Sequence, residues 1–234
     1  MDTWSQEHLA ALVAAAVTAG LLVAGARRLG TGWSVPAGRA VAIAMLVAYL
    51  AEHLTYVVRG DWSVRVNLPL QLTDAVTITA IVALWRVGPP QVVELVYFWA
   101  LSASLQAVLT PDLGHGFPDP LYFTYFATHG GAVAAACLLV FGERRAPRPG
   151  AVRRAYACTL AFACLAAAGT LLTGGNYMYL RRKPAHGSLL DVMGPWPVYI
   201  VAAGALGLLL FAALAALASR TGRRADRRQP SAPV

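Results

Sequence analysis

Apolar residues gather in seven long runs, separated by short stretches of glycine, proline and charged residues. Each run is close to the ~20 residues that an α-helix needs to cross the ~30 Å hydrocarbon core of a bilayer. Backbone polar groups inside a bilayer have no water to bind, so such runs must fold as helices. The pattern predicts spans at about 8–26, 36–58, 66–86, 90–110, 118–141, 152–174 and 194–218.

The connections between the runs reach only about 10–20 residues, so the chain leaves no room for a separate soluble domain. We therefore predict an all-α, polytopic membrane helical bundle of about seven transmembrane helices over residues 1–219. The tail over residues 220–234 is basic, contains proline and serine and has few apolar residues, which predicts disorder.

Composition supports the membrane class: 58% of the residues are hydrophobic, 13% are charged, and the mean hydropathy is +0.56. A water-soluble fold of this size would lack polar surface. The acidic start of the chain, with Asp2 after Met1, lacks the basic segment of a cleaved signal peptide, so the first run is expected to remain as a helix.

The positions of Lys and Arg predict the orientation, because short cytoplasmic loops retain positive charge. Of the 19 basic residues, all but five fall on the side that carries the C-terminus. We therefore predict a multi-pass protein of the cell membrane with its N-terminus outside and its C-terminus in the cytoplasm. The five exceptions are Arg59, Arg65, Arg181, Arg182 and Lys183.

The net charge of +8 comes mainly from arginines that flank helices or lie in the tail. This distribution favours membrane lipids as partners over nucleic acid. Cys137, Cys158 and Cys164 lie inside apolar runs without metal-ligand spacing, so we interpret them as packing residues and predict no metal or cofactor.

Polar residues open the third run, where a carboxylate in hydrocarbon is costly and should face the bundle. Gln71, Asp74 and Thr77 can share a helix face, and Thr73 adjoins it. Two interpretations of Asp74 stay open. It caps or pins a neighbouring helix, or it belongs to a polar active-site or substrate pocket.

The fourth run carries Ser102, Gln106 and Thr110 at i, i+4 spacing, which fits either helix packing or a binding site. In the fifth run Tyr122, Tyr125 and His129 form one stripe. Since His129 is the one histidine deep inside a run, it is the best general-base candidate, because histidine exchanges protons near neutral pH.

The segment 174–197 joins glycine, tyrosine and tryptophan to the strongest basic cluster on the predicted outer side. Arg181, Arg182 and Lys183 there are suited to a phosphate or carboxylate of a substrate. The alternative is pairing with carboxylates of the same side, namely Asp112, Asp119 or Asp191.

Four segments in this order resemble the YwaF-type bacterial integral membrane proteins over nearly the whole chain. They are Asn67–Asp74, Tyr97–Leu113, Phe126–Gly130, and Gly175–Leu180 with Gly194–Pro197. That family is similar to eukaryotic transmembrane protein 164, which implies an acyltransferase acting on ether phospholipids. It also looks distantly like the androgen-induced membrane hydrolases, which cleave fatty-acid esters with a threonine and a histidine.

The resemblance implies that Thr73 is the nucleophile and His129 the base. Many relatives have cysteine in the motif that reads Leu72-Thr73-Asp74 here. A threonine oxygen is a poorer nucleophile than a thiolate, so the change either keeps the chemistry in hydroxyl form or marks a member that has lost it.

The hypothesis that follows is a lipid acyltransferase or lipid-ester hydrolase with catalytic residues Thr73, His129 and Asp74, in which Asp74 or Glu52 orients the imidazole. A phospholipid or fatty-acyl ester is the expected substrate. The candidate substrate-binding residues, some of which would donate to a developing oxyanion, are Gln71, Gln106, Asn176, Tyr125, Arg181 and Arg182.

Two other classes of function remain open. Asp74, Glu94 and His129 can be interpreted as a proton relay in a transporter or binding protein for a small polar or anionic ligand. The same polar residues can also join helices in a non-catalytic membrane scaffold.

Overall fold

The computed structural model describes residues 3–86, 89–185 and 187–226, which form helices and loops without a β-strand. In this part of the chain six helical segments are long and apolar enough to cross a membrane, which confirms the predicted all-α membrane class. They are α1 (Gln6–Leu29), α2 (Thr31–Arg59), the continuous run Pro90–Leu109, the run Pro120–Gly142, α7 (Ala151–Thr173), and α8 (Val198–Asp226), of which Val198–Arg220 meets the criterion.

Two of these segments contain a π-helical turn. The run Pro90–Leu109 consists of α4 (Pro90–Trp99), η1 (Ala100–Ser104) and α5 (Leu105–Leu109). The run Pro120–Gly142 consists of α6 (Pro120–Cys137) and η2 (Leu138–Gly142). Two 3₁₀ turns, η3 (Tyr177–Tyr179) and η4 (Leu189–Met193), lie in the loop before α8.

The remaining apolar helix, α3 (Leu72–Leu84), has 13 residues and is shorter than the predicted run 66–86. At 1.5 Å per residue it covers about 20 Å, less than the bilayer core. Its predicted first residues are not helical, because Pro69 disfavours helix at the residue before it. The side-chain oxygen of Asn67 also accepts the Ser63 amide at 2.9 Å and stabilises a turn.

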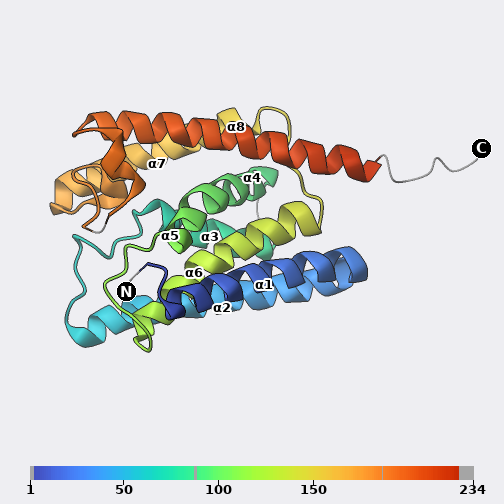
Figure 1. Cartoon of the computed structure of the whole chain (residues 1–234), viewed down its shortest axis with the longest axis horizontal. Helices are drawn as coiled ribbons and strands as arrows, with labels where there is room; N and C mark the ends of the chain where they lie inside the picture. The colour runs from blue at the N-terminus through green and yellow to red at the C-terminus, as the bar shows by residue number, and fades with distance from the viewer. Residues whose placement is uncertain (1–2, 87–88, 186, 227–234) are drawn as a thin grey trace, which may run out of the picture.

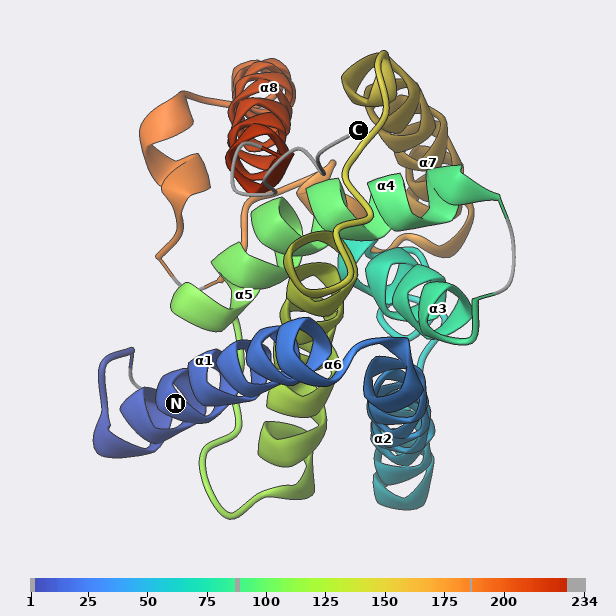
Figure 2. The ribbon, with the colours of Figure 1, turned by 90° about the vertical axis from the view of Figure 1, so that its right-hand side faces the viewer.

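Helix α6 lies in the middle of the bundle and packs against α1, α2, α3 and α4 (Figure 2). Helices α7 and α8 pack on the far side of α4. Small residues allow this central position: Ala132, Ala134, Ala135 and Ala136 are fully buried. Close approach of small residues is the usual way in which membrane helices associate.

The basic residues of the predicted inner side gather at one end of the bundle. The carboxylate of Glu94, only 3% exposed, accepts hydrogen bonds from Arg148 Nε at 2.8 Å and from Arg154 Nη2 and Nε at 2.8 and 3.0 Å. Glu143 accepts from Ser34 and Arg86. The bonds of Glu94 tie α4 to α7, and those of Glu143 tie the end of η2 to α2 and to the residues after α3.

Figure 1 places the N-terminal end of α1 and the C-terminal end of α8 at opposite ends of the bundle. Which end faces the cytoplasm stays a prediction from the charge distribution. Helix α8 continues through Asp226, and residues 227–234 of the predicted tail lie outside the described residues.

Asp119 fixes the other end of α6. Its Oδ1 accepts the Leu121 amide at 2.8 Å as an N-cap, and its Oδ2 accepts from Arg59 at 3.0 Å and faces His115 at 3.4 Å. The hydrogen bond from Leu121 and then the Arg59 guanidinium lower the pKa of this carboxyl.

We expect Asp119→Ala to lower the free energy of unfolding by about 1 kcal/mol, because a helix loses its cap. Since the folded pKa lies below the unfolded value, the contribution is present above about pH 4 and disappears as the pH falls through the folded pKa. Denaturation in detergent at pH 7 and at pH 3 measures the difference. Asp119→Asn is the control, since it keeps the cap and loses the charge; equal stability of wild type and Asp119→Ala at pH 7 would contradict the assignment.

Candidate functional site

The first turn of α3 carries the predicted nucleophile. Thr73 shares a helix stripe with Thr77, Ala80 and Leu84, at spacings of 4, 7 and 11 residues, and these three side chains are buried. Thr73 therefore lies on the interior side of α3. The free amide groups of a helix N-terminus surround this position and carry partial positive charge.

Asp74 caps its own helix, because its Oδ2 accepts the Gln71 amide at 3.0 Å. It also interacts electrostatically with Glu52 of α2. Tyr49, one helical turn from Glu52, interacts with both carboxylates. Asp74 therefore caps its own helix, rather than a neighbouring one, and lies in a polar cluster between α2 and α3.

The loop that precedes α3 is held by η3. Gln71 Oε1 accepts the Met178 amide at 2.8 Å. The hydroxyl of Tyr177 donates to the Val64 carbonyl at 2.6 Å and accepts the Leu68 amide at 3.2 Å. These bonds satisfy irregular backbone in the bundle, and they leave the side-chain NH₂ of Gln71 as a donor next to Thr73.

His129 lies on the interior side of α6, since it shares a stripe with the buried Ala132 and Ala136. Its Nδ1 donates to the Tyr125 carbonyl at 2.8 Å, and its ring stacks on Tyr125 with centroids 4.1 Å apart. A carbonyl oxygen can only accept, so Nδ1 carries the proton and Nε2 is unprotonated. The backbone carbonyl, rather than the expected Asp74 or Glu52, orients the imidazole.

Tyr125 connects His129 to the rest of the cluster. Its hydroxyl donates to the Ala107 carbonyl of α5 at 2.9 Å. It also interacts electrostatically with Glu52, Asp112 and Tyr179. The structure therefore gathers residues from α2, α3, α6 and η3 around the interface that α6 forms with α2 and α3.

The two predicted catalytic residues do not touch each other directly. In the described part of the chain no hydrogen bond joins the Thr73 hydroxyl to His129. Their helices pack against each other, and both side chains lie on interior stripes. Catalytic hydrogen bonds are often formed only when substrate is bound.

His8 shows how a structural histidine differs from His129. It is fully buried at the start of α1, although the sequence places it only near the edge of a span. Its Nδ1 accepts the Trp4 amide at 2.9 Å and its Nε2 donates to the Val108 carbonyl at 2.8 Å. Both ring nitrogens of His8 are used to fasten α1 to α5, which leaves neither for chemistry.

The candidate residues of the loop before α8 are Asn176, Arg181 and Arg182, and they have different roles in the structure. The side chain of Asn176 accepts the amides of Arg181 and Arg182 at 3.0 Å and donates to the Arg182 carbonyl, so its amide organises the loop. Arg181 and Arg182 are exposed, and neither forms an ion pair with a described residue. Asp119 pairs with Arg59 instead of with this cluster.

Gln106 is not brought into the cluster. It is exposed on α5, where its amide donates to the hydroxyl of Thr110 at 2.6 Å. The Ser102 hydroxyl donates to the Phe98 carbonyl in its own helix. The hydrogen bonds that this stripe forms among the described residues lie within one helical run, so they join no second helix.

The sequence reasoning missed two tyrosines. Tyr49 lies three residues before Glu52, the spacing that puts both on one face of α2, and this was the available signal. Tyr179 donates to Asp112 Oδ2 at 2.8 Å, and its pKa is raised by burial and then by that carboxylate. No spacing in the sequence links Tyr179 to Asp112, which are 67 residues apart.

An apolar groove of about 700 Å³ runs between α1, α2 and α6. Figure 2 shows α6 between the separated helices α1 and α2. Ala127 and Gly130 of α6, which flank His129 in the sequence, belong to its lining. The other lining residues are Gln6, Glu7, Ala10, Ala11, Ala14, Ala15, Thr18, Val41, Ala44, Met45, Phe117, Tyr122, Phe123, Phe126 and Gly131.

Fold and site together define a polytopic helical membrane protein with a polar cluster inside the bundle and an apolar groove between α1, α2 and α6. A family model described as the TMEM164 family matches residues 3–215, and the chain belongs to this family. This confirms the resemblance seen in the sequence motifs. No curated protein and no solved structure matches the chain.

Proposed function

We propose that this protein is a lipid acyltransferase or lipid-ester hydrolase of the cell membrane, with Thr73 as nucleophile and His129 as general base. The observation that carries the proposal is the hydrogen bond from His129 Nδ1 to the Tyr125 carbonyl. It fixes the tautomer in which Nε2 accepts a proton, as a general base requires. A histidine that only joins helices, such as His8, uses both nitrogens.

The chemistry proceeds in two steps. His129 Nε2 takes the hydroxyl proton of Thr73 while Oγ1 bonds to the carbonyl carbon of a lipid ester. The resulting oxyanion collapses, the ester C–O bond breaks, and the leaving alkoxide receives the proton from the imidazolium. Water or the hydroxyl of a second lipid then attacks the acyl-threonine and regenerates the Thr73 hydroxyl.

The start of α3 provides stabilisation for the oxyanion. Backbone amides of the first helical turn lie around Thr73, and the free NH₂ of Gln71 adds a donor. Each such donor is worth roughly 3 kcal/mol in the transition state. The bond from Nδ1 to the Tyr125 carbonyl also stabilises the imidazolium that forms during the first step.

The surroundings support a lipid as substrate. The groove between α1, α2 and α6 has an almost entirely apolar lining, which suits an acyl chain. Arg181 and Arg182 are exposed and form no ion pair with a described residue, and two guanidinium groups of this kind suit a phosphate headgroup.

The direct test incubates purified protein in nanodiscs with a lysophospholipid and a phospholipid acyl donor, and follows products by mass spectrometry. Transfer to the lysolipid identifies an acyltransferase, and release of free fatty acid identifies a hydrolase. If neither product forms and proteoliposomes show uptake of an anionic solute that depends on Asp74 and a pH gradient, the transporter alternative replaces this proposal.

Filling the groove should reduce the use of long acyl chains. Ala127 is exposed in the groove, so Ala127→Trp is expected to raise KM for long-chain esters about tenfold, because bulk replaces space for the chain. Short-chain esters should be affected less. Ala161→Trp, at an exposed position of α7, is the matched control. Equal KM values in both variants would exclude the groove as the acyl site.

A further inference from the structure

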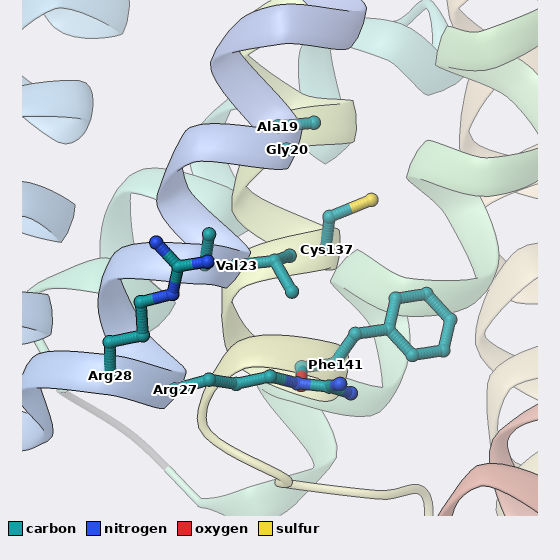
Figure 3. Close-up of a pocket in the computed structure, with 8 residues that line it drawn as sticks. Ala19, Gly20, Val23, Arg27, Arg28, Cys137 and Phe141 are labelled. Atoms are coloured by element: carbon teal, nitrogen blue, oxygen red, sulfur yellow. The ribbon is translucent and has the colours of Figure 1, made fainter.

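A second groove lies on the opposite face of α1, against the last turns of α6 (Figure 3). It has a volume of about 510 Å³. The residues of α1 that line it are about half a helical turn away from those that line the first groove, so the two grooves do not merge. Its lining residues are Ala19, Gly20, Val23, Ala24, Arg27, Arg28, Cys137 and Phe141.

The lining changes from apolar to basic along α1. Ala19 and Gly20 lie toward one end of the groove and the Arg27 guanidinium lies beside Phe141 toward the other, while the Arg28 guanidinium lies at the level of Val23 (Figure 3). Eight residues separate Ala19 from Arg27, which corresponds to about 12 Å along the helix. Because one leaflet contributes about 15 Å to the hydrocarbon core, the groove extends over most of a leaflet.

The two arginines are held differently. Arg27 Nε donates to the Phe141 carbonyl at 2.9 Å, which anchors this guanidinium at the end of η2. Arg28 makes no hydrogen bond with a described residue, and neither arginine forms an ion pair within the described part of the chain. One fixed and one free guanidinium therefore face the same space.

The charge at this end of the groove is net positive. The C-terminal ends of α1 and η2 meet here, and each helix end contributes about half a negative charge. Two guanidinium groups exceed these partial charges by about one unit. An anion is therefore favoured at the basic end, and hydrocarbon is favoured over the remaining lining.

We propose that this groove binds one molecule of an anionic phospholipid from the bilayer. Its phosphate lies between Arg27 and Arg28, and one acyl chain follows α1 toward Ala19 and Gly20. Basic residues at the ends of transmembrane helices are suited to anionic headgroups, and the apolar part of the groove opens to the bilayer rather than to water. This site is separate from the Thr73 cluster and does not depend on the proposed reaction.

Native mass spectrometry of the purified full-length protein tests the site, with phosphatidylglycerol and phosphatidylcholine added in competition. We expect wild type to retain one phosphatidylglycerol preferentially. Arg27→Gln combined with Arg28→Gln should weaken this retention about 10- to 30-fold, since each basic residue contributes about 1 kcal/mol of attraction. Equal retention of the two lipids by wild type would overturn the proposal.

The matched control removes the same charge at the same end of the bundle. Arg144 and Arg153 are exposed outside the groove, so Arg144→Gln combined with Arg153→Gln should leave retention unchanged. Gly20→Leu tests the apolar part without altering charge, because a side chain at Gly20 meets open space in the groove. It should also reduce retention. If the control lowers retention as much as the Arg27 and Arg28 pair, the attraction is general and the proposed site is wrong.

Discussion

Replacing Thr73 by valine or His129 by alanine is expected to lower acyl transfer or hydrolysis at least about 100-fold, because a positioned base contributes 10²–10⁴ to such reactions. Thr73→Val removes only the hydroxyl and keeps the shape of the side chain. The assay is product formation in nanodiscs at substrate concentrations above and below KM, which separates losses in kcat from losses in binding.

Two rescue variants make this prediction specific. Thr73→Ser keeps a hydroxyl and should retain measurable activity. Thr73→Cys supplies a better intrinsic nucleophile, so its activity should persist and become sensitive to thiol alkylation. Wild type also contains Cys137, Cys158 and Cys164, so the same alkylation of wild type is the reference.

Matched controls distinguish chemistry from folding. Thr79→Val removes a hydroxyl of the same helix that donates to the carbonyls of Ala75 and Val76, and it should leave activity within about twofold. His8→Ala should lower stability, because the Trp4 amide and the Val108 carbonyl lose the ring nitrogens that they bond. If Thr73→Val stays active while it remains folded, Thr73 is not the nucleophile and the proposed reaction fails.

Glu94→Ala is expected to lower the free energy of unfolding by about 2 kcal/mol, because a buried carboxylate loses its charged hydrogen bonds while the two arginines, 44% and 33% exposed, become hydrated. The carboxylate is 3% exposed and joins α4 to Arg148 before α7 and to Arg154 in α7. Denaturant titration of the purified protein in detergent, followed by circular dichroism, measures the change.

Glu94→Gln keeps the size of the side chain and one acceptor, and should cost less than Glu94→Ala. Asp61→Asn is the surface control, since Asp61 is exposed in the loop after α2, and it should change stability by less than about 0.5 kcal/mol. An unchanged stability of Glu94→Ala would show that the network does not hold α4 to α7.

The fold was largely predictable, because every span in hydrocarbon must satisfy its backbone hydrogen bonds internally. The apolar runs gave six spanning helices directly, since about 20 apolar residues have no other stable conformation in a bilayer. The start of α3 could not be predicted in the same way. Its bounds depend on Pro69 and on tertiary hydrogen bonds from Tyr177 to Val64 and Leu68, which lie more than 100 residues away in the chain.

The candidate site was predictable only in part. The positions of Thr73 and His129 on interior stripes follow from helix periodicity once the helices are known. The tautomer of His129 follows from the Tyr125 carbonyl, an acceptor that every helix offers and no motif marks. Gln106 and Asn176 have the residue types expected of oxyanion donors, yet their amides serve a neighbouring threonine and a loop.

The short length of α3 decides which bond of a lipid Thr73 can reach. A helix of 13 residues covers about 20 Å, so α3 centred in a hydrocarbon core of about 30 Å would start about 5 Å below the boundary with the headgroups. The carbonyl carbons of a glycerolipid occupy that same layer, whereas the middle of each fatty chain lies deeper. The depth of Thr73 would thus select the ester bond between a fatty chain and glycerol over bonds within the chains.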